Sequence, residues 1–274
     1  MFGRHVPTRV TVRVAAWLAA LSVSCGADPG ATLPIGDPAA GSLAGTAGSP
    51  AGGAPAVGVG GAPSPLGTPR CRPPVGMNGS PQTIEAAVAL LNALPKPTSA
   101  ACFVQSLDRP LTVYATNSAL SAQPALSARS PRVFIKIDRL WASVVVDGDS
   151  SYLLELSYLE PDGVRSVKGE VLTPVNEPLA LSAPYDRVHY AAGTVCGVCH
   201  RDEQPALDTS LSGAFASTPY RPRSETRVSW DALLIERQLC DWSVEPHRCE
   251  MLSALFDGGA TVEQPFPATM DTFY

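Results

Sequence analysis

Lysine is scarce in this 274-residue chain, because only Lys96, Lys136 and Lys168 occur among its 20 Lys and Arg residues. The formal net charge is −5, and the basic residues are scattered along the chain rather than clustered. A surface that binds nucleic acid needs a basic patch or stripe. The composition therefore excludes nucleic acid from the expected partners.

The chain also lacks the short motifs of several enzyme classes. It contains no Gly-x-Ser-x-Gly nucleophile elbow, no His-Glu-x-x-His motif and no Gly-rich phosphate loop. Beyond the first 25 residues, no apolar run is long enough to span a bilayer as a helix. These absences favour a non-enzymatic role over those hydrolase and nucleotide-binding classes.

The first 25 residues have the pattern of an export signal. Three arginines precede an apolar run at 14–23, which is too short for a stable membrane span. The run ends in small residues followed by Cys25, and this ending resembles a bacterial lipobox, with Ser22 where Leu is usual. The resemblance implies diacylation of Cys25, removal of the preceding residues and a lipid anchor in a membrane. An ordinary secretory signal cut near Cys25 is the alternative, and the Gly26 that follows leads us to expect the outer membrane rather than the inner.

The segment 26–70 has the composition of a disordered linker. Gly, Ala, Pro, Ser and Thr dominate it, and it contains no aromatic residue. Such a segment cannot bury enough apolar surface to offset the entropy of ordering it. We expect it to hold a folded module away from the membrane surface, facing the periplasm.

The pattern of segment 71–190 predicts a β-rich domain with an N-terminal helix. Ser80 and Pro81 form a good helix start, and apolar residues then recur at helical spacing up to Leu91. Two Asp-Gly-containing turns separate short β-patterned runs, with no helical pattern between them. The predicted strands are 111–115, 133–137, 141–146, 152–159 and 164–171. Consecutive short strands of this kind favour an antiparallel β-sandwich or open barrel.

The pattern of segment 191–274 predicts a small, helical and loop-rich region that contains cysteines. Ser229 can cap one helix, and Pro246 can start another that ends before Gly258. The expected fold class is therefore α+β, with the β-rich domain followed by this helical region.

Cysteine usage adds a constraint, since six cysteines remain if Cys25 carries lipid. In an exported chain an even number permits three disulfides. Cys71 and Cys102 flank the first predicted helix and could be joined across its base. The count also permits two disulfides together with two cysteines that hold a cofactor.

One short motif carries recognisable chemistry, Cys196-Gly197-Val198-Cys199-His200. Its spacing is that of a c-type haem attachment site. Two intervening residues place both sulfur atoms at one edge of a porphyrin, and the adjacent imidazole can then bind the iron.

Residues 194–201 resemble the attachment segment of c-type cytochromes, and the resemblance covers this segment alone. It implies one covalent haem c held by Cys196 and Cys199, with His200 as proximal ligand, in an electron carrier that serves a redox partner protein. For the sixth iron ligand we rank Met251 first and His247 second. Met270, His189 and an iron without a sixth protein ligand stay open.

Two readings without haem also stay open. Cys196, Cys199, Cys240 and Cys249 could form two disulfides that pin a helical cap, or some of them could hold Zn²⁺ together with His200 or His247. The chain would then be a disulfide-stabilised surface lipoprotein whose β-module binds a partner. A disulfide from Cys196 or Cys199 to a later cysteine would exclude the haem.

Overall fold

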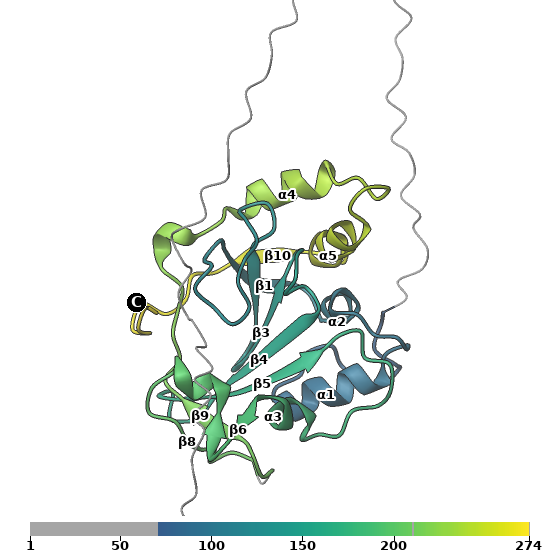
Figure 1. Ribbon diagram of the computed structural model, residues 1–274. Helices are drawn as coiled ribbons and strands as arrows, with labels where there is room; N and C mark the ends of the chain where they lie inside the picture. Colours follow the sequence, from purple (N-terminus) through teal and green to yellow (C-terminus); the bar gives the residue numbers. More distant parts are fainter. Residues whose placement is uncertain (1–70, 210, 274) are drawn as a thin grey trace, which may run out of the picture. The chain divides into compact units, whose positions relative to one another are not determined.

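A computed structural model describes residues 71–209 and 211–273 (Figure 1). The predicted signal segment, Cys25 and the predicted linker 26–70 lie outside these residues. Across the described part of the chain, no helix is both long and apolar enough to cross a membrane.

The centre of the fold is one eight-stranded sheet with the order β10-β1-β2-β3-β4-β5-β9-β8. All neighbouring strands are antiparallel except β10 and β1, which are parallel. A two-stranded ribbon of β6 and β7 stands apart from this sheet. The strands are β1 (Leu111–Thr116), β2 (Arg132–Ile137), β3 (Leu140–Val145), β4 (Leu153–Leu159), β5 (Ser166–Leu172), β6 (His189–Tyr190), β7 (Gly193–Thr194), β8 (Gln204–Pro205), β9 (Phe215–Ser217) and β10 (Thr261–Glu263).

The first five strands confirm the predicted ones to within two residues at each end. The glycines of the two predicted turns, Gly148 and Gly163, have φ of 98° and 72°, in the region that favours glycine. Alternation along β5 is also confirmed, since Val167 and Val171 point into the core while Lys168 lies on the opposite face.

Helices cover one face of the sheet, and together with it they form a single hydrophobic core. The α+β class with a mostly antiparallel sheet is confirmed. A sandwich needs a second packed sheet, and here helices occupy that position instead (Figure 1). The core joins residues of the predicted β-rich and Cys-rich regions, for example Leu91, Ile135, Leu233 and Leu252. The helices are α1 (Ile84–Ala93), α2 (Ala100–Ser106), α3 (Ala183–Val188), α4 (Trp230–Gln238) and α5 (Pro246–Phe256).

The first helix begins three residues later than the sequence pattern indicates. Thr83 is its N-cap, and the Thr83 hydroxyl accepts a hydrogen bond from the Ala86 amide at 3.1 Å. The Ser80 hydroxyl instead donates to the Asp108 carboxylate at 2.9 Å, so it is not available to cap the helix. The helix α2 is not predicted by the sequence pattern. Its N-cap is Ser99, whose hydroxyl accepts a hydrogen bond from the Cys102 amide.

Two disulfides join four of the cysteines. The predicted bond between Cys71 and Cys102 is confirmed, and it ties the start of the described chain to α2. Cys240 and Cys249 are bonded to each other, which links the end of α4 to α5.

The second face of the sheet is polar at its centre and is covered by irregular segments. Gln123 comes from the long loop 117–131 and is fully buried, with its amide donating to the Leu153 carbonyl at 2.6 Å. Beyond β10, Phe266 stacks on Trp141 at 4.5 Å between ring centroids. These segments shield polar side chains that would otherwise face open solvent.

A substitution at Gly169 on β5 tests how tightly α3 packs against the sheet. A Cβ atom at this position would lie 2.7 Å from the Cβ of Pro184 and 3.2 Å from its carbonyl oxygen. We expect Gly169→Ala to lower the free energy of unfolding by about 1–3 kcal/mol, because helix and strand must move apart. Denaturant unfolding measures this change, and Leu172→Ala, at an exposed position of the same strand, is the control. Equal stability of Gly169→Ala and wild type would contradict this packing.

Candidate functional site

The Cys-x-x-Cys-His segment forms one tight turn beside the β6–β7 ribbon. A 3-10 helix covers Val195–Val198 directly after β7. The amides of Cys199 and His200 both donate to the Cys196 carbonyl, at 3.1 and 2.8 Å. The turn therefore brings the two thiols and the imidazole together within five residues.

Glu203 holds this turn in place. Its carboxylate accepts hydrogen bonds from the amide and hydroxyl of Thr194. A Cβ atom at Gly197 would lie 2.7–2.9 Å from the carboxyl atoms of Glu203, so the glycine makes room for this carboxylate. No sequence motif marks Glu203, because its role depends on the folded loop.

The motif cysteines differ from the other four in the described chain. Cys196 and Cys199 are not disulfide-bonded, whereas the remaining four form two disulfides. The predicted alternative with two disulfides among Cys196, Cys199, Cys240 and Cys249 is therefore found only for the later pair. Burial raises the pKa of the Cys196 thiol to about 11, and the nearby Lys168 charge opposes this shift in part.

His200 is oriented by its neighbours so that one ring nitrogen is left for a ligand. Its Nδ1 lies 2.8 Å from the Thr218 carbonyl oxygen, and only a protonated Nδ1 can donate to that oxygen. Nε2 then carries the lone pair of the neutral ring. The Tyr220 ring stacks on the imidazole at 5.2 Å, and the Phe273 ring lies at 6.3 Å.

The environment keeps His200 neutral. Burial and, to a smaller extent, the positive charge of Lys168 together lower the pKa of the imidazole to about 3. A neutral imidazole with Nδ1–H on a backbone carbonyl is the arrangement that metal-binding histidines usually adopt.

Lys168 contributes a cation next to the motif. Its ammonium donates to the Ser217 hydroxyl at 2.9 Å and the Ser166 hydroxyl at 3.0 Å, with the carbonyl oxygens of the same residues at 3.4 and 3.2 Å. Burial lowers its pKa to about 8. No sequence motif marks Lys168, because its contacts depend on the pairing of β5 with β9.

A groove of about 440 Å³ opens beside His200. Residues 190–194, 197, 198 and 200–203 line it. Tyr190 and Val198 stand at this groove with 63% and 64% of their surface exposed.

The predicted sixth ligands lie in different environments of the fold. Met251 is buried in the core on α5, which packs against α2 and α4, and His247 is exposed at the start of α5. His189 lies in the ribbon, where it pairs with Thr194. Among the described residues, no three His, Cys, Asp or Glu side chains are grouped to hold a metal ion, so the predicted zinc set is not assembled.

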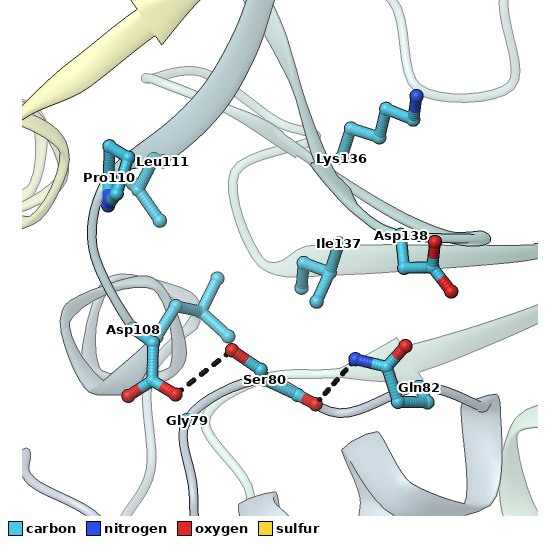
Figure 2. A pocket seen from close by; sticks show the side chains of 10 residues that line it. Gly79, Ser80, Gln82, Asp108, Pro110, Leu111, Lys136, Ile137 and Asp138 are labelled. Atoms are coloured by element: carbon cyan, nitrogen blue, oxygen red, sulfur yellow. Dashed lines mark hydrogen bonds between the residues drawn. The ribbon is translucent and has the colours of Figure 1, made fainter.

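A second, smaller pocket of about 200 Å³ lies between the start of α1 and strands β1 and β2 (Figure 2). Figure 2 shows Ser80 between Asp108 and Gln82, with the Gln82 amide donating to the Ser80 carbonyl at 3.0 Å. None of the sequence-predicted site residues lines it.

Comparison of the chain with protein family models, with curated proteins and with solved structures finds no match.

The lowered pKa of His200 predicts that the stability of the protein depends on pH. In the unfolded chain the imidazole takes up a proton below about pH 6.5, whereas the folded chain takes it up only near pH 3. Stability should therefore fall as the pH drops from 6.5 towards 4, on the order of 1 kcal/mol per pH unit. Denaturant unfolding at several pH values measures this slope.

His200→Gln should flatten that slope, and His247→Gln, at an exposed position, should leave it unchanged. A slope that survives in His200→Gln would assign it to other groups.

Proposed function

We propose that this protein binds one haem covalently through Cys196 and Cys199, with His200 as proximal iron ligand, and that it carries single electrons. The observation that supports this best is the orientation of His200. Its Nδ1–H donates to Thr218 at 2.8 Å, and its neutral ring keeps a lone pair on Nε2. The cofactor would supply a one-electron couple between Fe(II) and Fe(III).

The cysteines fit this attachment chemically. Each thiol S–H would add across one vinyl C=C bond, so that a C–S bond would form and the proton would go to the neighbouring vinyl carbon. The addition has no leaving group and transfers no electrons overall. It needs two cysteines that are not in disulfides, and neither Cys196 nor Cys199 is in a disulfide.

A porphyrin would lie along the groove beside the motif. The groove of about 440 Å³ reaches His200, and Tyr190 and Val198 offer apolar surface at its wall. A flat apolar macrocycle would cover side chains that now face solvent. Tyr220 and Phe273 pack on the imidazole and would keep its plane fixed.

We propose that the protein works while anchored to a membrane. Diacylation of Cys25 would hold it there, the linker 26–70 would give it reach, and a redox partner protein would exchange electrons with it on the periplasmic side. Covalent attachment suits an exported protein, because the cofactor cannot be lost by dilution.

Expression in a bacterial host that matures c-type cytochromes tests the haem. We expect a mass gain of one haem that survives denaturation and a sharp α-band on reduction. Cys196→Ala or Cys199→Ala should remove one thioether, and the double variant should lose covalent haem altogether. The control is Cys240→Ala with Cys249→Ala, which removes a disulfide of short loop and should keep the haem.

A wild-type protein that stays colourless in this host would falsify the proposal. It would favour the alternative, a disulfide-stabilised surface lipoprotein in which the motif has no redox role.

The anchor has a separate test. We expect the wild-type chain to incorporate labelled fatty acid and to sediment with membranes, whereas Cys25→Ala should do neither, because the acylated thiol is gone. Cys196→Ala is the matched control and should remain in the membrane fraction. Release of the wild-type protein into the soluble exported fraction would instead support an ordinary secretory signal.

A further inference from the structure

Lys168 places a positive charge close to the candidate haem site. Its ammonium contacts the carbonyl of Ser217, while His200 contacts the carbonyl of the next residue, Thr218. Because the two acceptors belong to consecutive residues, the ammonium and the imidazole lie within roughly 11 Å of each other. The side chain is fixed in this position by the hydroxyls of Ser166 and Ser217.

The carboxylates around Lys168 are each engaged with another group. Glu155 on β4 pairs with Arg132, Glu170 on β5 lies 3.4 Å from Arg187, and Glu203 binds Thr194. Lys168 itself forms no ion pair with any residue of the described chain. The Lys168 ammonium is therefore hydrogen-bonded only to neutral hydroxyl and carbonyl oxygens.

The charges of Lys168, the three carboxylates and their arginine partners sum to zero. Arg132, Arg187 and Lys168 supply three positive charges against the three carboxylates. Neutralising Lys168 would leave one negative charge in excess. In a partly desolvated site such a change acts over several ångströms with little screening.

We infer that Lys168 raises the reduction potential of the haem held by Cys196, Cys199 and His200. Oxidation of the iron would add one positive charge to the site, and the neighbouring ammonium would oppose that addition. The reduced state is therefore favoured, which makes the protein a stronger electron acceptor than the same site would be without this residue. The inference rests on the proposed haem attachment.

Redox titration of the haem-loaded protein at pH 6 tests the role of Lys168. For Lys168→Gln we expect about a tenfold lower ratio of reduced to oxidised haem at a fixed ambient potential, which is a lowering of the midpoint potential by about 59 mV for one electron. Lys168→Met removes the charge independently while keeping an unbranched side chain. Lys168→Arg, which keeps the charge, should titrate close to the wild type.

Lys136→Gln is the matched control, because it removes the same charge from the same face of the sheet on the more distant strand β2. Its midpoint potential should stay near that of the wild type.

An unchanged midpoint potential in haem-loaded Lys168→Gln or Lys168→Met would overturn the inference and leave the haem proposal intact. Loss of haem from both neutral variants would also overturn it, because Lys168 would then serve folding or attachment. Absence of haem from the wild-type protein would instead be a failure of the proposed function.

Discussion

Burial of one face of the sheet under the helices determines which side chains of β5 face the candidate site. Val167 and Val171 point into that core, so the alternation of β5 directs Ser166, Lys168 and Glu170 to the opposite face. A helix that packs tightly at Gly169 fixes the register of this strand against the core. A slip of one residue would exchange the two sets and move Lys168 into the hydrophobic interior.

Local patterns along the chain predict most of the sheet. Alternation and Asp-Gly turns place the first five strands because both signals lie within a few residues of the structure that they cause. The start of α1 is less predictable, since the choice between Ser80 and Thr83 depends on Asp108, far along the chain. The short strands β8, β9 and β10 have little pattern of their own and form through pairing with distant partners.

In the candidate site, too, residues close in the sequence are predictable and residues brought together by the fold are not. The spacing of Cys196, Cys199 and His200 is visible in the sequence, and a single turn keeps these residues together. Thr218, Tyr220 and Phe273 approach His200 from segments that only the fold brings near, and no periodicity marks them. Met251 was predicted as a sixth ligand from its position after the motif, but helical periodicity and packing place it in the core.

The bond between Cys71 and Cys102 also determines how the fold carries mechanical load. A pull on the chain from the side of residue 70 enters at Cys71 and passes through the disulfide to Cys102 on α2, in the hydrophobic core. Residues 72–101, including α1, are bypassed and carry no tension. A force applied from that direction therefore acts on the hydrophobic core as a whole and does not detach α1 from the sheet first.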